Sequence, residues 1–322
     1  MYTIGNNNTP MSVNIKNKIW TLGRYDEEAG YNNCENWHIL EIVSLKENYI
    51  EIPKHIKLGN INMILKSRLR NNIIYVISGP EIKTADDPSK NDTFVSNNPA
   101  LYSYDTANNL WAAIKTFSQE MILFSILEKN NGEIILIGLY DNYKYEILSD
   151  AKNYQKVNSD ELECKFGFTF FLDDNNSLWV YGGMDNKKNY YNEFKKIDCI
   201  NGEITYKQTI TSFDFRSFPY IRYKNGNLFI IGGTKDGYYP ASEIIKYDLM
   251  NNSFIFSQDI RNITNNYFAN YCIAEDENSL FVSSGYIFND KSRKYQYREY
   301  KINEIHETRI ERGYEGTRIY TN

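Results

Sequence analysis

The chain has 322 residues, a formal net charge of −5 at pH 7 and 15% aromatic residues. This acidic balance, without any Lys- or Arg-rich run, argues against a nucleic-acid or anionic-membrane partner. No apolar stretch reaches the roughly 18 residues that span a bilayer, so we expect no membrane insertion. The polar residues 1–10 do not resemble a signal peptide, so we expect a cytoplasmic protein, or a secreted or periplasmic one if a leader has been removed.

A short apolar run that ends in glycine recurs six times along the chain. Each run is too brief for a helix and is flanked by Asn and Gly, which indicates a strand. In chain order, the runs end at Gly23, Gly79, Gly138, Gly183, Gly233 and Gly285. Neighbouring copies are 45 to 59 residues apart. A period near 50 is typical of repeat folds in which one sheet stacks on the next.

Each repeat contains four predicted strands, which we name A to D; the glycine-ended run is strand B. The repeats span approximately residues 11–53, 61–115, 121–158, 164–209, 219–258 and 267–312. The fourth strand of the last repeat is the weakest. Residues 2–5 are therefore predicted to supply an outer strand there and to close a ring, with residues 317–320 as the competing closer.

Two features of the repeats match a known family. Glycine pairs end two B strands, and a Tyr-Asp pair in strand C is followed by an aromatic residue seven positions after the tyrosine. The matching residues are Gly182-Gly183, Gly232-Gly233, Tyr104-Asp105 with Trp111, and Tyr247-Asp248 with Phe254; Ile197-Asp198 with Ile204 is a degenerate copy. On these residues the chain resembles the kelch-repeat β-propeller family over nearly its whole length. The resemblance implies an all-β fold, with residues 1–322 forming one free-standing six-bladed propeller of four antiparallel strands per blade.

The repeat also predicts where packing is tight. Strand A should be buried on both faces, which fits the apolar runs at 121–127 and 168–172. Glycine at the end of strand B allows close backbone approach, and aromatic residues of strands C and D can fill the space between sheets.

Strand alternation places the B–C and D–A connections at one edge of each sheet and the A–B and C–D connections at the other. The A–B turns are short and polar, whereas the B–C connections are mostly long, especially 24–37 and 80–99. Long loops on a rigid scaffold more often carry function. We therefore predict that the B–C/D–A face is the working face.

Aromatic residues are frequent in the B–C connections, where they could serve as anchors for a partner or as platforms for sugar rings. Alternatively, the loops fold back and bury these rings as small local cores. We expect the ligand or partner to contact Arg24, Tyr25, Trp37, Tyr140, Tyr190, Tyr191, Arg216, Tyr238, Tyr239, Tyr286 and Phe288.

Arginines on this face have two interpretations. Arg24, Arg216 and Arg261 could hold a carboxylate by bidentate hydrogen bonds. Each also has an aspartate two residues away, so that a charge-paired residue at the rim is the alternative.

Catalytic and metal-binding motifs are absent. The histidines His38, His55 and His306 fall at different places in the repeat, and the four cysteines are far apart without a CxxC spacing, so we expect no metal and no cofactor. We expect a monomer that binds a protein or a glycan. The alternative is an enzyme similar to the bacterial kelch sialic-acid epimerases, which act on an acidic sugar without a metal.

Overall fold

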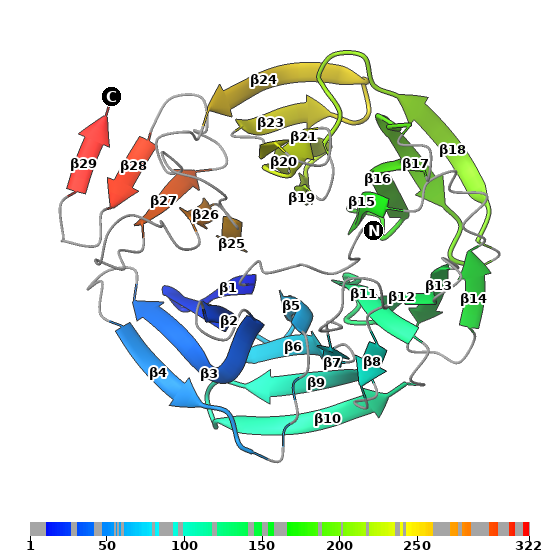
Figure 1. Cartoon of the computed structure of the whole chain (residues 1–322). Coiled ribbons are helices and arrows are strands. Elements are labelled where there is room, and N and C mark those ends of the chain that lie inside the picture. The colour runs from blue at the N-terminus through cyan, green and yellow to red at the C-terminus, as the bar shows by residue number, and fades with distance from the viewer. Residues whose placement is uncertain are drawn as a thin grey trace. The chain divides into compact units, whose positions relative to one another are not determined.

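The structure is a computed structural model of the chain (Figure 1), and each element among its described residues is a β-strand. It describes residues 11–26, 31–41, 47–54, 56, 58, 61–78, 81–83, 93–95, 99–117, 121–140, 145–149, 154–157, 166–185, 189–200, 202–216, 219–235, 239–240, 243–259, 271–275, 279–284, 296–301, 309–312 and 318–321. The chain divides into two compact units, Met1–Asn142 with Leu148–Lys152, and Tyr143–Ile147 with Asn153–Asn322. In these described ranges no helix has the length and hydropathy needed to cross a bilayer.

Three four-stranded antiparallel sheets follow one another from the first described residue. The first has the order β1 (Met11–Ile15), β2 (Lys18–Asp26), β3 (Tyr31–Glu41) and β4 (Glu47–Glu51). The second has the order β10 (Leu110–Thr116), β9 (Ala100–Asp105), β6 (Ile73–Ser78) and β5 (Ile61–Lys66). The third has the order β11 (Met121–Glu128), β12 (Ile134–Tyr140), β13 (Tyr145–Ser149) and β14 (Tyr154–Val157).

The later sheets repeat the plan. The fourth has the order β15 (Phe166–Leu172), β16 (Leu178–Met184), β17 (Glu193–Ile197) and β18 (Ile204–Thr209). The fifth has the order β19 (Tyr220–Lys224), β20 (Asn227–Ile231), β23 (Glu243–Asp248) and β24 (Ser253–Asp259). The last has five strands, β25 (Tyr271–Glu275), β26 (Ser279–Ser284), β27 (Gln296–Lys301), β28 (Arg309–Arg312) and β29 (Arg318–Thr321). Each of these larger sheets is built from strands within or next to one predicted repeat, while two further two-stranded sheets, β7–β8 and β21–β22, lie within the second and fifth repeats.

Within each unit the first strands of successive sheets lie side by side, β1 with β5, β5 with β11, and β15 with β19. Their facing surfaces form continuous apolar cores. In the first unit Trp20 packs against Tyr104 of the next sheet, with ring centroids 5.9 Å apart. In the second unit Phe194 packs against Tyr247 with centroids 5.5 Å apart. The predicted role of strand C aromatics between sheets is confirmed, because neither tyrosine retains exposed surface.

The first strand of the fourth sheet is buried as its apolar sequence predicts. Phe168, Phe170 and Phe171 are all buried in β15. Since a four-stranded sheet on its own would leave such rings in water, the sheets depend on stacking for stability.

The Tyr-Asp pairs owe their position to a turn that recurs between strands C and D. In each copy the aspartate Oδ1 accepts a hydrogen bond from the main-chain N–H two residues later, and the residue four positions later has positive φ. The aspartates are Asp105, Asp198 and Asp248. The positive-φ residues are Asn109 (53°), Gly202 (76°) and Asn252 (51°). In the first and third copies the preceding tyrosine donates its hydroxyl to that asparagine side chain. The motif therefore closes the turn and orients the core tyrosine together.

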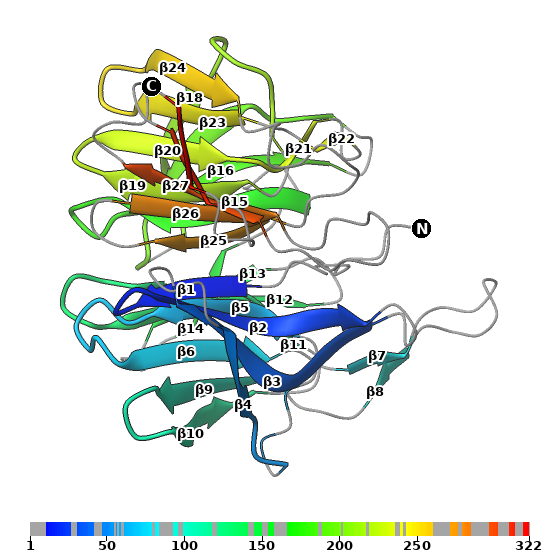
Figure 2. The same ribbon diagram turned by 90° about the vertical axis from the view of Figure 1, so that its left-hand side faces the viewer.

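Several connections predicted as long loops contain strands instead. Residues 24–26 extend β2 and residues 31–37 belong to β3, so that the expected loop at 24–37 is largely a hairpin in which Arg24 pairs with Asn33. The 80–99 connection contains β7 (Glu81–Lys83) and β8 (Thr93–Val95), which form a hairpin beyond the end of β6 (Figure 2). Between β20 and β23, β21 (Thr234–Lys235) pairs with β22 (Tyr239–Pro240) in a separate two-stranded sheet. The prediction of loops was wrong here because polar hairpins lack the apolar alternation of core strands.

The outer positions of the last sheet are taken by the carboxyl-terminal strands β28 and β29. Strand β29 contains most of the competing closer at 317–320. Residues 2–5 lie outside the described residues, so their predicted role in ring closure stays a prediction.

Candidate functional site

The B–C connection of the fourth sheet presents a tyrosine from a braced loop. Asn189 donates its main-chain N–H to Asp185 Oδ1 (2.9 Å) and its side-chain amide to Asp185 Oδ2 (2.7 Å). The hydroxyl of Tyr191 also donates to Asp185 Oδ2 (3.3 Å), and its main-chain N–H donates to Gly183 O (2.9 Å). Tyr190, between these contacts, retains 37% of its surface exposed. Because these contacts already order the backbone around Tyr190, binding of a ligand there would cost little further backbone conformational entropy.

The following D–A connection, residues 210–216, is fixed against the same sheet. Asn192 donates its side-chain amide to Phe213 O (2.6 Å) and Ile210 O (3.2 Å). The Tyr181 hydroxyl donates to Asn192 Oδ1 (3.0 Å) and accepts the main-chain N–H of Arg216 (3.1 Å). Burial raises the pKa of Tyr181 well above its usual value, only partly opposed by the Arg216 hydrogen bond and charge, so the hydroxyl stays protonated in this network.

Glycine lets the D–A connection come this close. Gly182 has φ of 77°, and a Cβ there would lie 3.1 Å from Arg216 O and 3.3 Å from Phe215 Cε2. The second glycine of the pair, Gly183, also has positive φ, at 110°. The predicted close approach at the end of strand B is therefore confirmed at Gly182.

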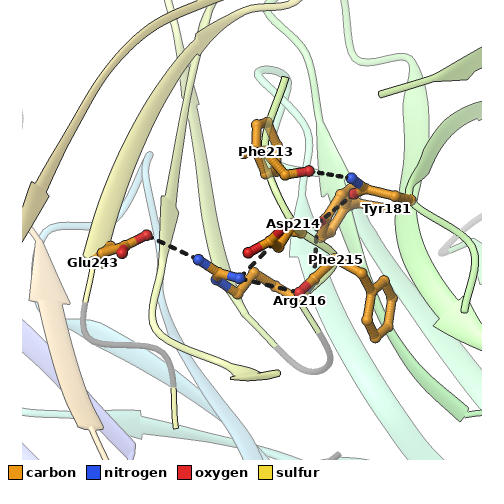
Figure 3. Close-up of polar contacts among 7 residues, drawn as sticks. Tyr181, Phe213, Asp214, Phe215, Arg216 and Glu243 are labelled. Atoms are coloured by element: carbon orange, nitrogen blue, oxygen red, sulfur yellow. Dashed lines mark hydrogen bonds and ion pairs between the residues drawn. The ribbon is translucent and has the colours of Figure 1, made fainter. Parts of the chain in front are cut away.

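Arg216 links this connection to the fifth sheet, as Figure 3 shows. Its side chain is only 2% exposed, and its Nη2 lies 2.9 Å from Oε2 of Glu243, the first residue of β23. Nη1 donates to the carbonyls of Asp214 (3.3 Å) and Phe215 (3.1 Å), while Nε has no hydrogen-bond partner within the described ranges. The pairing predicted with the Asp214 carboxylate is thus replaced by one with Glu243, and the guanidinium is buried rather than at a rim.

An aromatic pair lies beside the ion pair. The rings of Tyr190 and Phe215 have centroids 4.9 Å apart at an interplanar angle of 37°, and Phe215 is half-buried. In Figure 3 the Phe215 ring points away from the guanidinium. One B–C connection and one D–A connection therefore meet in a pair of rings, one exposed and one half-buried, and the residue after Phe215, Arg216, forms the ion pair with Glu243.

Tyr191 has a different role from its neighbour. Besides its contact to Asp185, its ring lies 5.3 Å from Nζ of Lys195. Lys195 is a buried cation that also pairs with Glu193, the first residue of β17, at 3.4 Å. These contacts fit the alternative interpretation in which a loop aromatic stabilises its own loop.

The other predicted contact residues are placed less fully. The structure describes only the backbone of Arg24 and Tyr25 in β2, Trp37 in β3, Tyr140 at the end of β12 and Tyr239 in β22. Tyr238, Tyr286 and Phe288 lie outside the described residues, as does Arg261. Phe215 and Glu243 were not predicted. The aromatic position at 215 in a D–A connection was the available signal for Phe215, whereas nothing in the sequence links Glu243 to Arg216.

No group of three or more His, Cys, Asp or Glu residues is placed to hold a metal ion in the part of the chain that the structure describes.

Comparison with solved structures gives the fold class. The chain is similar to the protein of "Structure of YjhT" at a TM-score of 0.56 and 10% identity, covering 98% of this chain and 97% of that one. It is similar to a calcium-binding protein, regucalcin, from Agrobacterium tumefaciens (TM-score 0.50, 12% identity, 88% and 86% covered) and to a luciferin-regenerating enzyme (0.51, 11%, 91% and 93%). These are all-β, propeller-like proteins, and this chain has a propeller-like fold of four-stranded antiparallel sheets. No family model and no curated protein matches the sequence.

Proposed function

We propose that this protein is a six-bladed, kelch-type propeller that binds a protein or a glycan on its B–C/D–A face. The observation that carries the proposal is the braced Tyr190–Phe215 pair, an exposed aromatic surface built where a B–C and a D–A connection meet. Tyrosine supplies a large contact area with few rotatable bonds, and aromatic rings are enriched both at partner anchors and beside sugar rings.

The ion pair of Arg216, the residue after Phe215, supports binding rather than catalysis. Glu243 already neutralises Arg216, and Tyr181 is engaged both as donor and as acceptor. An acidic ligand would have to displace a carboxylate from a buried guanidinium, which leaves a charge unpaired unless the ligand replaces it. The arginine therefore stiffens the D–A connection that carries Phe215.

A glycan array and a pull-down from the source cells, each run with the wild-type protein and with Tyr190→Ala, test this proposal. We expect specific glycans or proteins to be retained by the wild type and lost with Tyr190→Ala. Tyr49→Ala is the matched control, since Tyr49 in β4 is an exposed tyrosine of another sheet. Ligands retained equally by Tyr190→Ala, or lost equally with Tyr49→Ala, would contradict the proposed surface.

A second candidate, an enzyme acting on an acidic sugar, is favoured by one observation. Glu243 accepts a hydrogen bond from the Arg216 guanidinium and the Tyr181 hydroxyl accepts one from the Arg216 main-chain N–H, while the buried Arg216 Nε lacks a partner among the described residues. Proton NMR of a sialic acid, following its ring-form and epimer signals, tests this candidate. Faster exchange with the wild type, lost with Arg216→Ala while the protein stays folded, would replace the binding proposal.

A further inference from the structure

A short basic turn joins β5 to β6. It lies at the end of the sheet opposite to the B–C connections. Lys66, Arg68 and Arg70 supply three positive charges, and residues 66–72 contain no acidic residue. Arg68 and Arg70 are exposed, and Leu69 between them is 59% exposed. We call residues 66–70 the basic turn. Its local charge is opposite in sign to the net charge of −5 of the whole chain.

The basic turn is held in shape by a buried carboxylate of the neighbouring sheet. Glu128, which ends β11, is 3% exposed and accepts a hydrogen bond from Ser67 Oγ (2.9 Å). It also accepts the main-chain N–H of Arg68. Ser67 Oγ in turn accepts the main-chain N–H of Arg70 (3.0 Å), and Ile73 donates to Arg70 O (2.9 Å). One main-chain N–H and one serine hydroxyl thus satisfy Glu128, so that neither arginine side chain is needed for it.

Both arginine side chains remain available. The Arg68 guanidinium reaches one neutral partner among the described residues, Asn130 Oδ1 at 3.4 Å. The Arg70 side chain makes no hydrogen bond or ion pair within the described ranges. Nearby Lys129, by contrast, pairs with Glu133 at 3.0 Å. Cations that carry no ion pair among the described residues are groups that a carboxylate can bind without breaking an existing pair.

Leu69 is held between these charges by the next A–B turn. Its Cδ1 lies 2.6 Å from the position that a Cβ on Gly132 would occupy, so glycine at 132 makes room for the leucine. The exposed surface is therefore an apolar side chain flanked by two cations on a turn whose backbone is already ordered. The backbone of such a turn loses little conformational entropy on binding.

We propose that the basic turn docks an acidic segment of a partner protein, in which carboxylates flank an apolar residue. The carboxylates pair with Arg68 and Arg70, and the apolar residue covers Leu69. A nucleic acid fits less well, because three cations on an acidic protein give weak phosphate binding and the turn has no ring on which a base can stack. This site is independent of the Tyr190 surface, which is built from other sheets.

The test is selection of a phage-displayed random dodecapeptide library on the full-length protein, with counter-selection on Arg68→Ala/Arg70→Ala. We expect clones that carry Asp or Glu on both sides of a Leu, Ile or Phe. A synthetic peptide from such a clone should bind Arg68→Ala/Arg70→Ala and Leu69→Ala at least about tenfold more weakly, a typical anchor effect. Its affinity should fall as salt is raised.

Matched variants separate docking from folding. Lys16→Ala/Lys54→Ala removes two exposed positive charges elsewhere and should leave the peptide affinity unchanged, as should Tyr190→Ala. Arg68→Ala keeps the main-chain N–H that Glu128 accepts, so an unchanged melting temperature is expected. Clones without acidic residues, equal enrichment on the double variant, or tighter binding of a 12-nucleotide single strand would each overturn the proposal.

Discussion

Replacement of Gly182 by alanine tests the close approach on which the candidate site is built. An L-residue in the left-handed region costs about 1–2 kcal/mol, offset in part by the about 0.4–1 kcal/mol gained when glycine's freedom in the unfolded chain is removed. The new methyl group would also lie 3.1 Å from Arg216 O and 3.3 Å from Phe215 Cε2. Because the first neighbour is backbone, residues 213–216 must move, and forcing atoms into a packed region costs about 1–3 kcal/mol.

Gly226 provides the control for the backbone term. Its φ is 80°, close to the 77° of Gly182, but the nearest atom to its would-be Cβ is Met250 Cγ at 3.9 Å. Gly226→Ala should therefore carry only the conformational cost. At roughly 2–4 °C per kcal/mol, Gly182→Ala should melt about 2–12 °C below Gly226→Ala in differential scanning calorimetry. Equal melting temperatures would refute the close approach, and with it the steric reason for glycine at position 182.

Two further predictions concern the charges and hydroxyls around the cores. Burial, and secondarily the Asp105 carboxylate, raises the pKa of Tyr104 from 10.0 to about 12; the unfolded chain therefore loses this proton first, and the free energy of unfolding should fall as pH rises from about 10 to 12. Tyr104→Phe should make that fall shallower in urea titrations without abolishing it, because burial also raises the pKa of Tyr181 and Tyr247; an equally steep fall in both proteins would show that Tyr104 does not contribute to it. Glu243→Gln leaves Arg216 without its counter-charge and should lower the free energy of unfolding by about 1–3 kcal/mol in urea melts. Asp214→Asn, which keeps the main-chain carbonyl that Arg216 uses, should cost much less; the reverse order would mean that Asp214 is the true partner.

The repeat could be predicted from sequence because its signals are local. A glycine pair indicates a backbone with positive φ, and the structure has positive φ at both Gly182 and Gly183. An aspartate after a strand tyrosine reports a turn closed by its own side chain, as found at Asp105 and Asp248. These interactions span only a few residues, so that the residue types and their spacing carry the geometry.

The site was less accessible to prediction because its contacts cross between sheets. Glu243 is 27 residues from Arg216 in sequence and belongs to a strand of the next sheet. Asp214 was considered as the ion-pair partner only because it is two residues from Arg216. Likewise, the polar stretch around Arg24 was predicted as a loop, but a hairpin needs only paired backbone groups and no apolar face. Tyr190 and Tyr191 look equivalent in sequence, and only their contacts separate an exposed ring from one that braces its loop.

The most direct test of the proposed function is the dissociation constant of a recovered glycan or protein for three proteins, measured by isothermal titration calorimetry. These are the wild type, Tyr190→Ala and Tyr49→Ala. If Tyr190 anchors the ligand, its loss should weaken binding by about 1–3 kcal/mol, roughly 5- to 150-fold, with a smaller negative heat-capacity change because less apolar surface is buried. Tyr49→Ala should bind as the wild type does. Unchanged binding by Tyr190→Ala would contradict the assignment of the working face.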